Sequence, residues 1–157
     1  MVFFESPSNP MQGLVDITAV SDLAHQAGAT VVVDNVFATP ILQKPLDLGA
    51  DVVVYSTTKH IDGQGRSVGG AILGSEQYIV VVVQPFIRHT GPALSPFNAW
   101  VLTKSLETLP LRVNAEVASA LALAEALEGL DGVERVWYPY LASHPQHDLA
   151  RSQMASG

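Results

Sequence analysis

Short apolar runs that end in polar turns mark the first third of the chain. They occupy residues 2–4, 30–33 and 51–55, and each is rich in valine or aromatic residues. Runs of this length bounded by turn residues are typical of buried β-strands. We therefore predict three strands here.

The segments between these runs predict crossovers. Residues 16–26 have apolar positions at helical spacing, with Asp16 as an N-cap and Gly28 as a stop. Residues 40–49 predict a short helical or irregular connection. Strands that alternate with such connections are typical of an α/β fold, a mostly parallel sheet with helices on both faces.

The middle of the chain predicts a fourth strand over residues 68–73, which are rich in glycine and small apolar side chains. A helix is expected over 76–89, although the four valines at 80–83 favour a strand. Ser95 followed by proline predicts a helix over 95–109, because serine caps and proline fits the first turn.

The last third predicts a long amphipathic helix over residues 111–127, a strand over 133–138 and a loop-like tail over 139–157. The strand would begin something new after the stop at Gly129.

Polar side chains follow each of the three predicted parallel strands. They are Asn9, the pair Asp34 and Asn35, and the cluster Ser56–Lys59. Twenty-five residues separate Asn9 from Asp34, and the same number separates Asp34 from Lys59. Since carboxyl ends of parallel strands meet at one edge of a sheet, a shared ligand site is expected there.

The residue types at this edge suit a particular chemistry. A lysine amine held against apolar walls becomes a nucleophile toward an aldehyde. A carboxylate and several hydroxyls could hold a pyridine nitrogen and a phosphate, which are the needs of pyridoxal phosphate. The alternative is structural: Asp34 caps a turn, Ser56 and Thr58 satisfy backbone groups, and Lys59 is solvated. Residue types alone leave both open.

Composition narrows the class of protein. The chain of 157 residues is 48% hydrophobic, carries a net charge of −7 and has no cysteine. This predicts a globular, cytoplasmic protein without nucleic-acid or membrane partners, disulfides or thiolate metal sites. No leader peptide is expected before residue 2. His144, His147 and Asp148 are potential metal ligands without a supporting cluster, so no metal is predicted.

Several segments together resemble one enzyme family. They are ESPSNPMQGLVDI, VVVDNVFATP, VVYSTTKHIDGQGR, VGGAILG, RHTGPALSPFNAWVLTKSLETLPLRV and YPYLASHPQHDLARSQM. In this order they are similar to the Cys/Met-metabolism family of pyridoxal-phosphate enzymes. The resemblance runs along nearly the whole chain and implies part of the aspartate-aminotransferase-like fold. Residues 1–129 would be the second half of the large cofactor-binding domain, and residues 130–157 would be a linker and the start of the small C-terminal domain, with the boundary near Gly129.

The resemblance implies roles for five residues. Lys59 matches the lysine that binds the cofactor covalently and later moves protons, and Asp34 matches the acid that pairs with the pyridine nitrogen. Ser56 and Thr58 match phosphate-binding hydroxyls. Asn9 matches an asparagine near the cofactor oxygen and the substrate carboxylate, whereas Thr57 has no counterpart.

Within the family, TKHIDGQGR after DNVFATP is most similar to the O-succinylhomoserine sulfhydrylases, since lyases more often carry a GHSD-type run at Gly63–Arg66. The cystathionine γ-synthases, the cystathionine and methionine γ-lyases, and a truncated binding or structural remnant stay open as alternatives. The resemblance implies an amino-acid substrate and a homo-oligomer, a tetramer built from dimers.

Family members are longer than this chain, so we expect the chain alone to be incomplete as an enzyme. Arg66, Arg88 and Arg112 do not match the arginine that grips the substrate carboxylate in the family.

Overall fold

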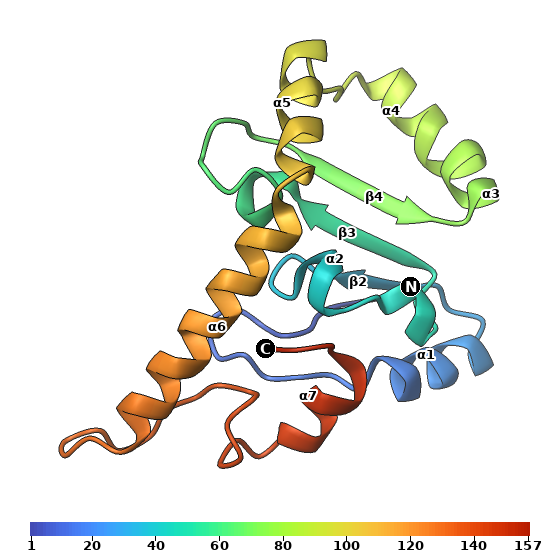
Figure 1. The fold of residues 1–157 in the computed structure, drawn as a ribbon. Coiled ribbons are helices and arrows are strands. Elements are labelled where there is room, and N and C mark those ends of the chain that lie inside the picture. The colour runs from blue at the N-terminus through green and yellow to red at the C-terminus, as the bar shows by residue number, and fades with distance from the viewer.

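The fold is built on a four-stranded sheet with strand order β1-β2-β3-β4 (Figure 1). A computed structural model describes residues 1–157. The strands are β1 (Val2–Glu5), β2 (Val31–Asp34), β3 (Val52–Ser56) and β4 (Gly70–Gly74). The strands predicted over residues 2–4, 30–33, 51–55 and 68–73 are all present, with ends displaced by two residues or fewer.

The first three strands are parallel and the fourth is antiparallel. Asp34 pairs with Glu5 of β1 and with Val54 of β3, while Ser56 at the end of β3 pairs with Gly70 at the start of β4. The sheet is therefore mixed and mostly parallel. The carboxyl ends of its three parallel strands lie at one edge.

Local sequence signals explain where the long helices begin. In α1 (Ile17–Gln26) the Asp16 carboxylate accepts a hydrogen bond from the Ala19 N–H at 2.9 Å. In α5 (Pro96–Leu106) the Ser95 hydroxyl accepts one from the Asn98 N–H at 3.1 Å. Both caps satisfy donors that a helix cannot pair internally, as predicted.

The other helical segments connect or flank the sheet. They are α2 (Thr39–Leu42), a 3-10 turn (Pro45–Leu48), the turn Thr57–Ile61, α3 (Glu76–Tyr78), α4 (Gln84–Thr90), α6 (Leu109–Glu128) and α7 (His147–Gln153). A π-helical stretch, Ile79–Val83, joins α3 to α4, so residues 76–90 form one helical segment as predicted. The four valines do not override it.

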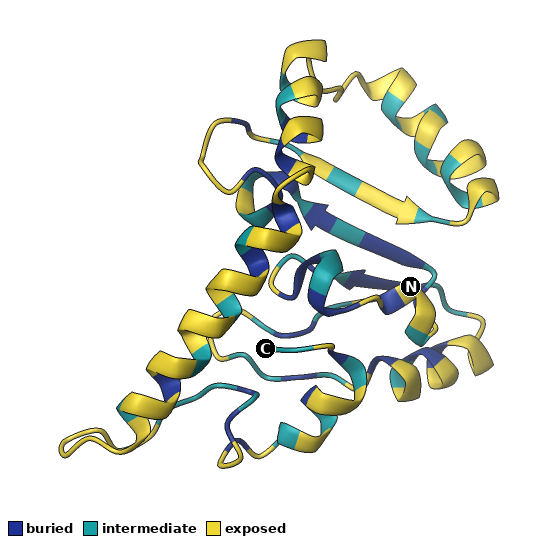
Figure 2. Cartoon of the chain, viewed as in Figure 1, coloured by how far each residue is buried: buried dark blue, intermediate teal, exposed yellow.

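Two apolar clusters form the core. Ile17 and Ala24 of α1 pack against Val31 and Val33 of β2. A larger cluster joins β3 to helices from distant parts of the chain through Val53, Leu102, Leu109, Val113, Ala150 and Met154. The outer surfaces of α4, α5 and α6 remain largely exposed (Figure 2). Phe3 of β1 and Ile72 of β4 are also exposed.

Two predictions for the C-terminal third are wrong. Residues 133–138 form no strand, because no other segment supplies hydrogen bonds along them. The tail is not a loop either: it contains α7, whose Ala150 is fully buried. The predicted boundary near Gly129 stays a prediction.

Amide side chains attach this tail to the first loop of the chain. The Gln146 side chain accepts from the Leu14 N–H at 2.8 Å and donates to the Leu14 carbonyl. Gln153 of α7 donates to the Val15 carbonyl at 3.1 Å and to Gln43 Oε1 at 3.2 Å. Since buried amides are costly unless paired, these bonds fix where α7 docks.

No helix in this structure is both long and apolar enough to cross a lipid bilayer.

Candidate active site

The candidate residues lie where the three parallel strands end. Asp34 is the last residue of β2 and Ser56 the last of β3, on neighbouring strands. Thr58 and Lys59 follow in the next turn, and Asn9 follows the end of β1 by four residues. The backbone thus brings all five predicted residues to the same edge of the sheet.

Asp34 is half-buried and stabilises its own turn with one oxygen. Its Oδ1 accepts a hydrogen bond from the Val36 N–H at 3.1 Å, which turns the chain away from β2. Asp34 takes part in none of the four ion pairs of the chain. The carboxylate therefore keeps an oxygen that can accept a hydrogen bond from a ligand.

The hydroxyl cluster after β3 is divided between structural and available groups. Thr58 Oγ1 accepts from the Gly69 N–H at 3.1 Å and lies 3.4 Å from the Gly69 carbonyl, to which it donates. Ser56 is half-buried at the end of β3. Thr57 is buried, and its hydroxyl has no hydrogen-bond partner. Part of the structural alternative for Thr58 is thus correct, because its hydroxyl holds the next loop.

Lys59 is exposed and forms no ion pair. Because Lys59 is exposed, the expected apolar walls do not enclose its side chain. Its backbone is unusual within the turn Thr57–Ile61, hereafter the Lys59 turn, with φ −86° and ψ −125°. The Lys59 main chain is therefore not helical, although it lies within a helical turn.

Asn9 is exposed in the loop after β1, where its main-chain N–H donates to Glu5 Oε2 at 2.9 Å. Its side chain is accessible to a ligand at the same edge.

Two charged residues with no role predicted from the sequence, Arg112 and Asp62, support the Lys59 turn. Arg112 of α6 donates to the His60 carbonyl at 2.7 Å and to the Ile61 carbonyl at 3.0 Å. Asp62, which is buried, accepts from the Arg66 Nε at 3.0 Å and from the Ser67 N–H at 3.3 Å. A signal existed in the sequence: an arginine in the first turn of a helix opposes the helix dipole and needs another reason to be there.

The Asp62 carboxylate stays charged through these contacts. Burial alone would raise its pKa, but the hydrogen bonds from Arg66 and Ser67 and the Arg66 charge hold the pKa of Asp62 below its ordinary value.

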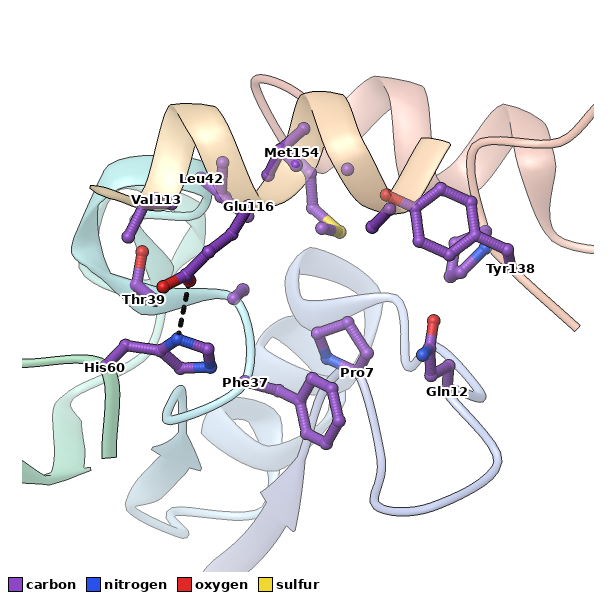
Figure 3. A pocket seen from close by; sticks show the side chains of 15 residues that line it. Pro7, Gln12, Phe37, Thr39, Leu42, His60, Val113, Glu116, Tyr138 and Met154 are labelled. Atoms are coloured by element: carbon purple, nitrogen blue, oxygen red, sulfur yellow. Dashed lines mark hydrogen bonds and ion pairs between the residues drawn. The ribbon is translucent and has the colours of Figure 1, made fainter. Parts of the chain in front are cut away.

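A pocket of about 180 Å³ lies beside the Lys59 turn (Figure 3). Phe37, Met154 and Tyr138 contribute to its wall, and on one side His60 Nδ1 lies 3.0 Å from Glu116 Oε2 of α6. None of the five predicted residues lines it, so this pocket is not the predicted cofactor site.

The histidines of the tail contact aromatic rings. No group of three potential ligand side chains in the structure could hold a metal ion. His144 is buried with its ring 4.8 Å from that of Trp137, and its Nδ1 accepts from the Gln146 N–H at 3.1 Å. His147 lies against Tyr140.

The residues at the strand ends fit pyridoxal phosphate in the chemistry of their side chains. The Lys59 amine is accessible and free of ion pairs, so it can reach an aldehyde. Asp34 has an oxygen to accept from a protonated ring nitrogen, and Ser56, Thr58 and Asn9 bring hydroxyl and amide groups to the same edge. This donor set matches the three functional groups of the cofactor.

Comparison with known proteins supports the same chemistry. A family model described as "Cys/Met metabolism PLP-dependent enzyme" matches residues 1–157. An O-succinylhomoserine sulfhydrylase of Mycobacterium tuberculosis is 66% identical over 156 residues, and one of Pseudomonas aeruginosa is 57% identical over 155 residues. Both alignments cover 99% of this chain but only 38% of the relative. The chain thus spans well under half the length of these curated relatives.

Solved structures share the fold. A cystathionine gamma synthase from Xanthomonas oryzae pv. oryzae, in complex with aminoacrylate and cysteine, matches with a TM-score of 0.95 and 41% identity. The alignment covers 99% of this chain and 40% of that structure. With a family match over the full length and this structural agreement, the chain belongs to the Cys/Met-metabolism family of PLP-dependent enzymes.

Proposed function

We propose that this protein binds pyridoxal phosphate at the carboxyl edge of the sheet and transfers sulfur in amino-acid metabolism. The reaction proposed is O-succinylhomoserine sulfhydrylation: sulfide replaces succinate at the γ-carbon of the substrate and yields homocysteine. The convergence of Lys59, Asp34, Ser56, Thr58 and Asn9 at three neighbouring strand ends is the observation that carries the proposal. The 66% and 57% identity to sulfhydrylases supports the choice of reaction.

Each residue has a defined task in this proposal. Lys59 would hold the cofactor through its amine and would then take and return substrate protons. The Asp34 carboxylate would accept from the ring nitrogen, and Ser56 would supply a hydroxyl to the phosphate. Thr58 would do the same by exchanging its 3.4 Å bond to the Gly69 carbonyl for one to the phosphate. Asn9 would offer its side-chain amide to the cofactor oxygen or the substrate carboxylate. When bound, the cofactor supplies an electron-accepting ring that stabilises negative charge on the substrate carbons.

Two alternative reactions are those of other relatives. An L-methionine gamma-lyase of Pseudomonas putida is 45% identical, and a probable cystathionine gamma-synthase of Herpetosiphon aurantiacus is 41% identical. A synthase would use cysteine instead of sulfide, and a lyase would add no nucleophile. Product analysis with sulfide, with cysteine and with neither separates the three reactions.

We also propose a cytoplasmic homo-oligomer without nucleic-acid or membrane partners. The net charge of −7 argues against contacts with phosphate backbones and anionic lipid. Exposed apolar side chains on α4, α5 and α6, such as Phe86, Trp100 and Leu111, support association with further protein surface.

Borohydride reduction tests the cofactor site. The protein is loaded with pyridoxal phosphate, reduced and digested, and the peptides are mapped by mass spectrometry. We expect label on Lys59, and label on Lys44 or Lys104 instead would refute the assignment. Sulfide-dependent formation of homocysteine from O-succinylhomoserine then tests the reaction. A protein that fixes cofactor on Lys59 but makes no product with any nucleophile would be a binding remnant.

A further inference from the structure

We infer that Arg112 is a positioning residue, which fixes the Lys59 turn from α6 and so places the Lys59 amine at the sheet edge. The inference rests on the proposed role of Lys59. Arg112 donates hydrogen bonds to two main-chain carbonyls at the end of this turn.

The guanidinium group joins three segments of the chain. Its two terminal nitrogens donate to the carbonyls of His60 at 2.7 Å and Ile61 at 3.0 Å. One of them also donates to the Ser105 carbonyl at 3.2 Å, at the end of α5. A planar fork of donors can hold several carbonyls at fixed angles, which an ammonium group cannot.

The Lys59 turn needs such support because it is not a regular helix. The Lys59 and Thr57 carbonyls accept from the N–H groups of Gly63 at 2.7 Å and Asp62 at 2.9 Å. The next two carbonyls, those of His60 and Ile61, are the ones that Arg112 binds. The Lys59 backbone departs from helical angles, and the arginine adds side-chain bonds where the regular main-chain pattern is interrupted.

Two features of the sequence fit this role. Arg112 lies in the first turn of α6, where a positive charge opposes the helix dipole, so its carbonyl contacts must offset that cost. Gly63 has a φ of +69°, and a Cβ there would overlap the Arg112 Nη1. The glycine therefore provides both the turn and the space for the guanidinium.

Arg66 supports the turn from its other end. It binds the buried Asp62 and donates to the Ser105 hydroxyl at 2.7 Å. Ser105 thus accepts a hydrogen bond from each arginine, from Arg66 through its hydroxyl and from Arg112 through its carbonyl. These bonds connect the Lys59 turn and Asp62 to the end of α5.

The test compares Arg112→Met and Arg112→Lys with Val113→Ala in the full protein chain. Val113 is the buried neighbour of Arg112 in α6, and its truncation weakens the packing of α6 without removing a bond to the Lys59 turn. The first readout is amide hydrogen exchange of Asp62 and Gly63 in cofactor-free protein without denaturant. The second is the pyridoxal phosphate concentration that gives half-maximal borohydride labelling of Lys59.

We expect Arg112→Met to speed exchange at these two amides about tenfold and to raise the half-maximal cofactor concentration by a similar factor. Arg112→Lys should give the same changes with smaller size. If Arg112→Met does not fold, Arg112→Lys carries the test. Val113→Ala should leave both readouts at wild-type values despite a lower melting temperature.

Wild-type exchange and labelling in both Arg112 variants would overturn the inference, as would equal changes in Val113→Ala, which would indicate general loosening. A wild-type protein that never labels Lys59 would instead refute the proposed function. The exchange readout would still decide whether Arg112 holds the turn.

Discussion

Single side chains at the strand ends differ in how much the fold itself uses them. Thr58 holds Gly69 through its hydroxyl, Asp34 uses one carboxylate oxygen for Val36, and Lys59 has no ion-pair partner. Substitutions of Thr58 should therefore affect both stability and ligand binding. Substitutions of Lys59 should affect ligand binding and chemistry alone.

At Asp34 we predict that replacement by Asn keeps cofactor binding but removes turnover, by roughly a hundredfold or more, since a neutral amide cannot hold the proton on the ring nitrogen. Cofactor absorbance and homocysteine formation are measured in a full-length context, with these 157 residues inside a complete enzyme of the family. The control is Asp22→Asn on the exposed surface of α1, which should keep wild-type cofactor absorbance and a wild-type rate of homocysteine formation. A wild-type rate in Asp34→Asn would contradict the role.

His144 predicts a pH dependence of stability. Burial, with the nearby charges of His147 and Arg135, lowers the pKa of His144. In the unfolded chain His144 binds a proton near pH 6.5, whereas in the folded chain it binds the proton only at lower pH. The free energy of unfolding should therefore decrease as the pH falls below about 6.5.

Urea denaturation at pH 7.5 and pH 5.5 tests this. His144→Gln should lower stability at pH 7.5 and lose less between the two values than the wild type. His89→Gln, on an exposed surface, should keep the wild-type difference. An unchanged pH dependence in His144→Gln would show that this histidine does not contribute.

At the scale of elements, the Lys59 turn depends on contacts with other elements. Its own main-chain bonds close part of it, and Arg112 of α6 adds two more, to the His60 and Ile61 carbonyls. Arg112 is itself bonded to the Ser105 carbonyl of α5. The same holds for α7, which has no side-chain cap and is placed by Gln153 and the Met154–Gln43 bridge.

Two glycines after the Lys59 turn offer a matched comparison. Gly63 and Gly65 have φ of +69° and +66°, but a Cβ would meet Arg112 only at position 63, with nothing within 4 Å at position 65. Gly65→Ala should cost about 1 kcal/mol for the left-handed backbone. Gly63→Ala should cost about 1–3 kcal/mol more, because it displaces the charged donor from its carbonyls. Equal losses in urea denaturation would show that Arg112 moves aside freely.

At the scale of the whole molecule, many large apolar side chains are exposed to solvent. A groove between the sheet and the helical segment 76–90 is lined by Val54, Ile72, Val82 and Phe86. Phe97 and Trp100 of α5 lie 68% and 57% exposed, within reach of each other at 6.1 Å between ring centroids. Surface of this kind is typical of faces that contact more protein.

We therefore predict that the 157-residue polypeptide, expressed alone, self-associates or aggregates, holds cofactor weakly and is catalytically negligible. Light scattering and cofactor titration measure this. Phe86→Ser, Phe97→Ser and Trp100→Ser together should reduce association, whereas Glu125→Ser on α6 should not. A monodisperse monomer that binds pyridoxal phosphate tightly and makes homocysteine would contradict the prediction.

The sequence by itself determined the elements whose signals are local. The strands follow from short apolar runs, and α1 and α5 begin where Asp16 and Ser95 cap donors three residues ahead. Because parallel strands end at one edge, the placement of Asp34 and Lys59 also followed from the order of elements.

Tertiary structure decided what depends on partners far along the chain. Residues 133–138 have strand-like composition but no neighbour to pair with, and α7 forms where Gln146 and Gln153 meet the loop of Leu14 and Val15. The support of the Lys59 turn by Arg112 likewise joins positions about fifty residues apart. A local pattern states what a segment can bond, but only the packed chain determines which distant group supplies the bond.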